Sequence, residues 1–333
     1  MLTFKLYKGG LHDWNIFLKK RKFYDVRHSY NYYEYLKVIN NNDNIYPYLI
    51  FKDEPITENL IGQFIVKKKK YFFLTIIYIY CGPTNIENYF KDFTPNLILK
   101  NLNVDKGISY IRLKTFLPES LIDKFDIKKN NWNSLQDTEQ NLFLDLKKNV
   151  THLKKNLSRN WRHNFYRSKK NILKTRIITH AEHHKIYELY EEMCKIKKIN
   201  MPFTKPSFEK FFHFFKDDIV SIGAYFNGKL VSVRSIVKFQ NKALDIFAAT
   251  GLSGRNLFAS YRLLWEIILI CKKNKIETLD LNGLDKINNL GVYNFKIGIG
   301  GSIYKQLGIL EYCNFKLLLP LFNIIINFIK KIN

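Results

Sequence analysis

Apolar residues in the first part of the chain come in short runs of strand length. Such runs of apolar, β-branched and aromatic residues, bounded by turn residues, predict strands at 46–51 (YPYLIF), 60–66 (LIGQFIV), 71–79 (YFFLTIIYI) and 108–113 (ISYIRL). We expect the lysine run 67–70 to form the turn between the second and third strands. Successive short strands of this kind favour a β-meander.

The second half of the chain alternates helical and strand-like patterns. The pair Asn227 and Gly228 predicts a tight hairpin, because both residues accept the positive φ that such turns need. The order of helices, antiparallel hairpin, helix and strand is that of a GNAT-type acyltransferase fold. The predicted elements are a strand at 138–146, a basic helix at 147–171, helices at 181–197 and 207–215, strands at 219–226, 229–238 and 242–249, a helix at 257–273 and a strand at 278–281.

Length and composition predict two domains of mixed α/β (α+β) structure. At about 150 residues per domain, 333 residues favour two domains, although one large domain remains an alternative. The polar stretch 130–137 (NNWNSLQD) suggests a boundary. We therefore predict an N-terminal domain at 1–135, a C-terminal domain at 136–312 and a separate amphipathic, apolar segment at 313–333.

The C-terminal segment is the most apolar part of the chain. Residues 315–332 read FKLLLPLFNIIINFIKKI, in which Pro320 and Asn323 interrupt the apolar run. A bilayer-spanning helix needs about 20 apolar residues. Two interpretations remain open: the segment lies in a membrane interface, held by lysines against anionic head groups, or it is a terminal helix packed on the core.

The charge balance points to polyanionic partners. Lys and Arg number 54 and Asp and Glu 29, giving a net charge of +25. Such a field attracts nucleic acid, phosphorylated substrates or an acidic membrane face, although A/T-rich codons would also enrich lysine. With 46% hydrophobic residues the chain is not a disordered segment. The four cysteines lack metal-ligand spacing, so no metal site is expected. Residues 1–10 lack the apolar run of a signal peptide, which favours a cytoplasmic location.

Three stretches resemble the Fem-type peptidyl aminoacyltransferases, a family with a GNAT-like fold. The first is 143–146 (FLDL) followed by the basic stretch 153–170, and the second is 79–84 (IYCGPT). The third is 280–283 (DLNG) with 291–301 (GVYNFKIGIGG), which is the most specific of the three. The resemblance covers nearly all of the chain.

This resemblance implies two GNAT-like acyltransferase domains in tandem and an aminoacyltransferase activity. The implied reaction forms an amide bond between the aminoacyl group of an aminoacyl-tRNA and an amine of a peptidoglycan precursor or another lipid-linked or nucleotide-linked cell-envelope acceptor. It implies no cofactor, because aminoacyl-tRNA is a co-substrate. A role in cell-wall biogenesis and cell shape would place the protein in the cytoplasm, peripherally at the inner face of the membrane.

Phe295 and Lys296 are the predicted catalytic residues. They precede Gly298, Gly300 and Gly301, whose backbone could approach a ligand closely. A lysine there could bring positive charge to a phosphate or a developing oxyanion. The alternative is a lysine that only solvates a glycine-rich loop. The resemblance favours the functional interpretation, because it implies that this lysine supports acyl transfer.

The predicted substrate-binding residues lie on several segments. Arg159, Arg162 and Arg167 could grip phosphates from one helix face, although that face could also be merely solvated. By a looser likeness, Lys37 and Lys205 correspond to positions that hold the diphosphate of the acceptor. Lys205 stands where arginine is more usual in the family. A lysine at this position lacks the planar guanidinium of arginine.

The signature region supplies two further candidates for substrate binding, Asn282 and Tyr293. Asp280 at the same strand end could act as a base or could serve in a cap or turn. The stretch 251–259 (GLSGRNLFA) lacks the spacing of the loop that cradles the pyrophosphate of coenzyme A. Two alternatives remain: an acyl-CoA-dependent N-acyltransferase acting on an amino sugar in surface-polysaccharide synthesis, and a non-catalytic RNA-binding protein.

Overall fold

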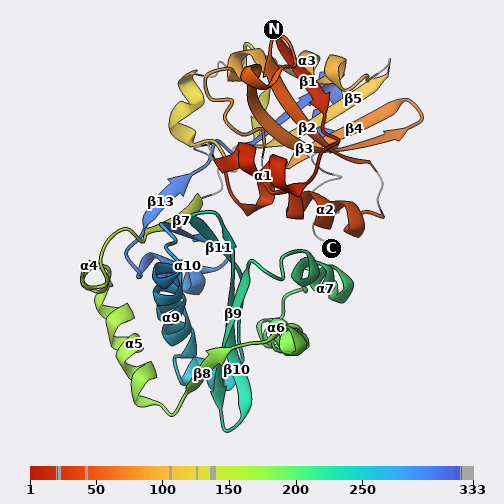
Figure 1. Cartoon of the computed structure of the whole chain (residues 1–333). Coiled ribbons are helices and arrows are strands. Elements are labelled where there is room, and N and C mark those ends of the chain that lie inside the picture. Colours follow the sequence, from red (N-terminus) through yellow and green to blue (C-terminus); the bar gives the residue numbers. More distant parts are fainter. Residues whose placement is uncertain are drawn as a thin grey trace. The chain divides into compact units, whose positions relative to one another are not determined.

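The chain forms two compact units, each built on its own β-sheet (Figure 1). Unit 1 comprises Met1–Glu139 and Lys305–Asn333, and unit 2 comprises Gln140–Tyr304. This computed structural model describes residues 1–19, 21, 24–41, 44–80, 82–104, 107–124, 127–135, 140–322 and 324.

The sheet of unit 1 has the order β1-β2-β3-β4-β5-β14-β6. Strands β2, β3 and β4 form the predicted antiparallel meander, and β5 pairs parallel to β4. The strands are β1 (Leu2–Leu6), β2 (Ile45–Lys52), β3 (Leu60–Tyr71), β4 (Leu74–Tyr80), β5 (Ile108–Lys114), β6 (Asn133–Leu135) and β14 (Ile309–Cys313). The helices are α1 (Leu11–Lys19), α2 (Tyr30–Ile39) and α3 (Pro95–Asn101), with short 3-10 turns that include η6 (Lys316–Leu318).

The turn predicted at the lysine run is wrong. Strand β3 continues through Lys67–Lys70 to Tyr71, which pairs with Leu74 at the start of β4. The hairpin therefore turns at Phe72 and Phe73. Lysines fit the strand because alternate side chains point to opposite faces of the ladder, and their long aliphatic stems let the ammonium groups reach polar partners, as Lys68 reaches the Leu102 carbonyl.

The C-terminal end of the chain returns to unit 1, unlike the prediction of a second domain that extends to residue 312. Strand β14 pairs antiparallel with both β5 and β6, and Leu310 is fully buried in the core of unit 1. Of the predicted segment 313–333, the described part packs partly on unit 1, where Phe322 stacks on Tyr110 with ring centroids 4.5 Å apart. Residues 325–333 lie outside the described residues. Within the described ranges, no helix has the length and apolar character to cross a membrane.

The sheet of unit 2 has the order β13-β7-β12-β11-β10-β9-β8. Figure 1 shows α9, with α5 outside it, on one face of this sheet and α6 on the other. The strands are β7 (Gln140–Asp145), β8 (Lys174–Ile177), β9 (Ile219–Phe226), β10 (Lys229–Phe239), β11 (Lys242–Thr250), β12 (Thr278–Gly283) and β13 (Ser302–Lys305). The helices are α4 (Val150–Lys155), α5 (Arg159–Lys170), α6 (His183–Lys197), α7 (Lys205–Phe214), α8 (Leu252–Asn256), α9 (Ala259–Lys273) and α10 (Leu290–Ile297).

Local turn and cap chemistry decides two boundaries in unit 2. The predicted hairpin is confirmed, with Asn227 and Gly228 at φ 49° and 78° between β9 and β10. The single basic helix predicted at 147–171 is wrong, because the chain breaks between α4 and α5. Ser158 caps α5 by accepting a hydrogen bond from the Trp161 amide, and its own amide donates to the Gly298 carbonyl at 2.9 Å.

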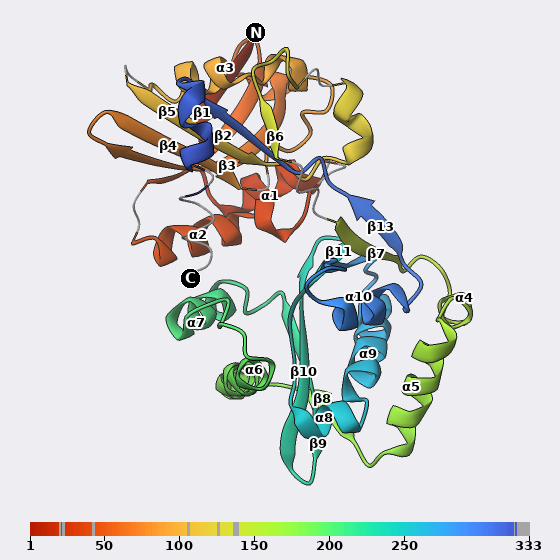
Figure 2. The ribbon, with the colours of Figure 1, turned by 180° about the vertical axis from the view of Figure 1, so that it is seen from behind.

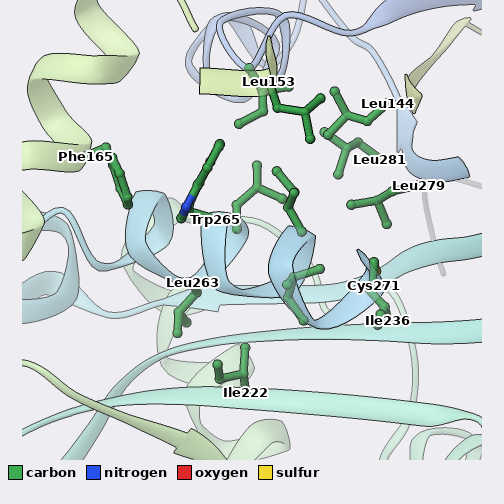
Figure 3. Close-up of a cluster of buried hydrophobic side chains, with 14 of the residues drawn as sticks. Leu144, Leu153, Phe165, Ile222, Ile236, Leu263, Trp265, Cys271, Leu279 and Leu281 are labelled. Atoms are coloured by element: carbon green, nitrogen blue, oxygen red, sulfur yellow. The ribbon is translucent and has the colours of Figure 1, made fainter. Parts of the chain in front are cut away.

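The core of unit 2 is centred on α9, which is buried between α5 and the sheet. Figure 3 shows Leu263 beside Ile222 of β9, whereas Trp265 lies toward Phe165 of α5. The rings of Trp265 and Phe165 are 5.5 Å apart between centroids. Helix α9 therefore ties the outer helix to the strands that carry the candidate site.

Removing one buried side chain of α9 tests this arrangement. We expect Leu263→Ala to lower the free energy of unfolding by about 2–5 kcal/mol, because it leaves a cavity in a packed core. Leu269→Ala on the same helix is the matched control, since Leu269 is exposed. Urea unfolding followed by circular dichroism measures both. Equal effects of the two substitutions would contradict the placement of α9.

Candidate active site

A cavity of about 550 Å³ lies in unit 2 where two parallel strands separate. Strands β11 and β12 pair only from Lys242 opposite Thr278 to Leu244 opposite Asp280. Beyond that point the two strands no longer pair, and β12 bends at Asn282, whose φ is 63°. Residues from β10, β11, β12, α6, α9 and α10 line the opening.

Lys296 lies near the C-terminal end of α10 and lines this cavity. Its Nζ donates a hydrogen bond to the carbonyl of Gly283, at the end of β12, at 2.6 Å. Burial lowers the pKa of Lys296, and the positive charge of Arg234 adds to this effect, whereas the carboxylates of Asp245 and Asp280 oppose it. The structure thus holds a lysine ammonium group in a partly desolvated, charged environment.

Arg234 and Asp245 form a buried ion pair in the wall of the same cavity, and the sequence analysis missed both. The Arg234 guanidinium donates to Asp245 Oδ2 at 2.8 Å, and Asp245 is only 7% exposed. Asp245 Oδ1 is buried and has no hydrogen-bond partner among the described residues. Burial raises the pKa of Asp245, while Arg234 and Lys296 act in the opposite direction.

A bulge explains why these two charges meet. Arg234 pairs with Ala248 in the β10–β11 ladder, so plain alternation would place Asp245 opposite Val237, on the other face. The register shifts between Ser235 and Ile236, and Asp245 pairs with Ile236 instead. The extra residue turns Asp245 to the face of Arg234. The signal in the sequence was one charged residue in the middle of each of two apolar strands.

Phe295, the other predicted catalytic residue, forms part of the cavity wall and of its support. The guanidinium of Arg234 lies 5.3 Å from the centroid of the Phe295 ring. The ring also contacts Tyr261 edge-on at 5.0 Å and packs against Trp161 at 6.1 Å. Phe295 therefore connects the buried ion pair to the hydrophobic core that holds α10.

The end of β12 is shaped by hydrogen bonds to Asp280. Its Oδ2 accepts from the Asn141 side chain at 2.8 Å, and its Oδ1 accepts from the Asn282 amide at 2.7 Å. Both oxygens are therefore engaged, which favours the turn role over the base role for Asp280. Of the two substrate-binding residues predicted in this region, Asn282 lines the cavity, whereas Tyr293 on α10 is not among its lining residues.

The glycine-rich turn after Lys296 packs against protein, which differs from the expected approach to a ligand. A Cβ at Gly300, where φ is +87°, would lie 2.5 Å from the carbonyl oxygen of Asn156. A Cβ at Gly298 would lie 2.9 Å from the Ser158 hydroxyl. These glycines let the turn fit against the break between α4 and α5, and so fix α10 and Lys296.

The three predicted arginines lie on α5. Arg159, Arg162 and Arg167 are exposed, and within the described ranges no acidic side chain pairs with them. The Arg167 guanidinium lies 4.0 Å from the centroid of the Phe258 ring. The face is available to a polyanion, and its function stays a prediction.

The two predicted diphosphate-binding lysines lie in different units. Lys37 is on α2 of unit 1, where its Nζ is 3.7 Å from Glu34 Oε2. Lys205 begins α7 of unit 2 and lines a second cavity of about 420 Å³ together with four histidines, among them His183. Burial, and next to it the charge of His180, lowers the pKa of His183 to about 4, so it is neutral at pH 7.

In the described part of the chain, no group of three or more His, Cys, Asp or Glu side chains could hold a metal ion. The stretch 251–259 forms α8 and the start of α9, with Arg255 and Ser260 in the cavity wall.

Comparison with known families and structures identifies similar proteins. The sequence model of the FemAB family matches residues 227–326, a stretch that includes Arg234, Asp245, Phe295 and Lys296. The Fem-type resemblance is thereby confirmed. The crystal structure of FemX superposes with a TM-score of 0.76 at 12% identity, covering 95% of this chain and 99% of FemX. The chain has the FemX fold, two GNAT-like domains in tandem.

Other solved structures share the Fem-type architecture at lower similarity. A conserved protein of unknown function from Bacteroides thetaiotaomicron has a TM-score of 0.60 at 11% identity, covering 94% of this chain and 99% of that one. L-PGS from Bacillus licheniformis has a TM-score of 0.55 at 9% identity, covering 91% of each chain. No curated protein matches the sequence. The FemAB match supports an acyltransferase.

The packing role of the glycine turn can be tested by adding one methyl group. We expect Gly300→Ala to lower the free energy of unfolding by about 1–3 kcal/mol, because Ala would be strained at this φ and would meet the Asn156 carbonyl. Gly291→Ala in α10 is the matched control, because its Cβ would meet no atom within 4 Å. Thermal unfolding measures both variants. A Gly300→Ala protein as stable as the control would show that the turn is not packed as described.

Proposed function

We propose that this protein is a Fem-type aminoacyltransferase. It transfers the aminoacyl group of an aminoacyl-tRNA to an amine of a peptidoglycan precursor or another lipid-linked cell-envelope acceptor. The observation that carries the proposal is the convergence of Lys296 and the Arg234–Asp245 pair on one cavity of unit 2. The FemAB match over 227–326 and the FemX fold support it.

The reaction needs alignment and charge stabilisation more than covalent chemistry. The acceptor nitrogen attacks the ester carbonyl carbon of the aminoacyl-tRNA, and the carbonyl oxygen becomes an oxyanion. The intermediate then collapses, the bond from the carbonyl carbon to the ribose oxygen breaks, and the proton lost by the amine ends on that oxygen. One amide and one tRNA hydroxyl result, so most of the acceleration comes from positioning and from stabilising the oxyanion.

Lys296 is the group that we assign to the oxyanion. Its ammonium is oriented by the Gly283 carbonyl at 2.6 Å and is partly desolvated, which strengthens its interaction with a developing negative charge. The carboxylates of Asp245 and Asp280 counter the lowering of its pKa and so favour the charged form. Loss of that charge at high pH would remove the stabilisation.

Asp245 is the group that we assign to the donor. Asp245 lines the cavity, and its buried Oδ1 has no hydrogen-bond partner among the described residues, which is costly for a carboxylate oxygen. The α-ammonium of an aminoacyl ester supplies both the hydrogen bond and the opposite charge. The acyl group of an acyl-CoA has no such cation. This favours the aminoacyl-tRNA donor over the acyl-CoA alternative acting on an amino sugar.

The other predicted residues receive roles in binding the two substrates. The exposed arginines of α5 would contact tRNA phosphates, with a salt-dependent affinity. Lys37 and Lys205 are each proposed as contacts for phosphate groups of the acceptor. A lipid-linked acceptor would place the protein peripherally at the inner face of the membrane.

The proposal predicts a specific loss on removing the Lys296 charge. We expect Lys296→Met to fold normally and to lose about 100-fold or more of the transfer rate, because one oxyanion donor is removed. Lys286→Met, on the exposed loop before α10, is the matched control and retains activity. The measurement is transfer of label from a radiolabelled aminoacyl-tRNA pool into a lipid extract of membranes, with and without RNase.

Three results of this assay would contradict the proposal. Transfer that survives in Lys296→Met would remove the lysine from the mechanism. Transfer that appears only when acyl-CoA replaces the tRNA would identify the other donor. Salt-sensitive tRNA binding with no product from any donor would identify a non-catalytic RNA-binding protein.

A further inference from the structure

The β3–β4 hairpin of unit 1 ends in three consecutive exposed aromatic residues. Phe72 is 98% exposed and Phe73 70% exposed, and Tyr71 beside them is also exposed. Large apolar side chains that project together from one turn are unusual on a soluble surface.

The turn itself does not explain these residues. Phe72 has φ 43°, a conformation that Asn or Gly adopts at much lower cost than a bulky aromatic residue. The hairpin thus keeps a phenylalanine at a strained position where its ring makes no packing contribution to the core. Strain that is retained in this way points to a role for the side chain outside the fold.

A second exposed apolar segment lies next to the hairpin, at 315–321. Leu317 is 95% exposed, and Phe315 and Leu321 are also exposed. Leu318 and Leu319 pack against the same buried cluster, Tyr110, Cys313 and Phe322, as Leu74, the first residue after the hairpin turn. Figure 2 shows this helical segment, in dark blue, beside β4 and β5.

Hydrogen bonds connect the two segments through the start of β5. The Ile108 amide donates to the Phe73 carbonyl at 2.7 Å, and the Asn314 side chain donates to the Gly107 carbonyl at 2.7 Å. The Ser109 amide in turn donates to Asn314 Oδ1 at 2.8 Å. We call the exposed apolar residues of both segments the tip patch: Tyr71, Phe72, Phe73, Phe315, Leu317 and Leu321.

Lysines accompany the tip patch. Lys69 and Lys70 precede the hairpin turn, and Lys316 is exposed between Phe315 and Leu317. The Lys68 ammonium donates a hydrogen bond to the Leu102 carbonyl at 2.7 Å. The tip patch is therefore bordered by basic residues from both segments.

We propose that the tip patch is a membrane-docking surface that inserts into the interface of an anionic lipid bilayer. Aromatic rings suit the boundary between head groups and acyl chains, and neighbouring lysines suit anionic head groups. A projecting hairpin tip penetrates a fluid bilayer, whereas a protein partner would need a matching socket. The inference rests on unit 1 alone and does not depend on the proposed transfer reaction.

Vesicle cosedimentation of the full chain tests the proposal. We expect binding to vesicles of equal parts phosphatidylglycerol and phosphatidylcholine, and much weaker binding to phosphatidylcholine alone or at high salt. Phe72→Asn combined with Phe73→Ser should weaken binding about tenfold or more, because two apolar rings are no longer transferred from water into the bilayer. This variant should fold normally, since Asn accepts the φ of position 72.

The matched control replaces two equally exposed apolar residues of unit 2. Ile172→Ser combined with Ile287→Ser removes side chains that are 82% and 92% exposed and lie outside the tip patch. We expect this control to bind vesicles as the wild type does. Unchanged binding by the Phe72 and Phe73 variant would overturn the proposal and would point to another part of the chain.

Self-association is the competing use of the same surface. Sedimentation velocity without lipid should show the same oligomeric state for the wild type and for the variant with both Phe72→Asn and Phe73→Ser. A wild-type dimer that this variant abolishes would overturn the lipid assignment. Label transfer to a soluble acceptor should be equal in the two proteins, so a failure of membrane docking is distinguishable from a failure of the proposed activity.

Discussion

The candidate site depends on the short parallel pairing of β11 and β12. The two strands share a ladder over only three residue pairs, ending at Leu244 and Asp280, and then separate. A sheet that stayed paired would have filled this space with backbone. Because it opens instead, side chains from several elements can face one cavity that is still surrounded by a packed core.

A buried ion pair occupies the wall of this opening and sets its electrostatics. Burying Arg234 and Asp245 costs desolvation energy, so the pair is weak evidence for a stabilising role. It is better understood as part of a charged cavity in which Lys296 is held by the Gly283 carbonyl. The glycines beyond Lys296 act at a distance from the chemistry, since they fit the turn after α10 against the break between α4 and α5.

The sequence predicted the features that local residues determine. The Asn227–Gly228 hairpin follows from the φ preferences of two residues. The signature with Phe295 and Lys296 led to the cavity because it is a contiguous stretch of sequence.

Features that depend on distant contacts could not be predicted in this way. The return of β14 to the sheet of unit 1 pairs residues about 200 positions apart, such as Leu310 and Leu113. The meeting of Arg234 and Asp245 depends on a bulge that reverses the facing of one strand. The helix break before Ser158 is matched by a glycine turn far along the chain, and no periodicity within the helix reveals it.

The most direct test of this account is binding of a stable donor analogue to the cavity. A short RNA acceptor stem can carry an alanyl group through a non-hydrolysable amide, and a matched analogue can carry a propionyl group, which lacks only the α-amine. Isothermal titration at neutral pH should give tighter binding of the alanyl analogue to the wild type and equal binding of both to Asp245→Asn. Equal binding of the two analogues to the wild type would contradict the central claim that this cavity recognises an aminoacyl group.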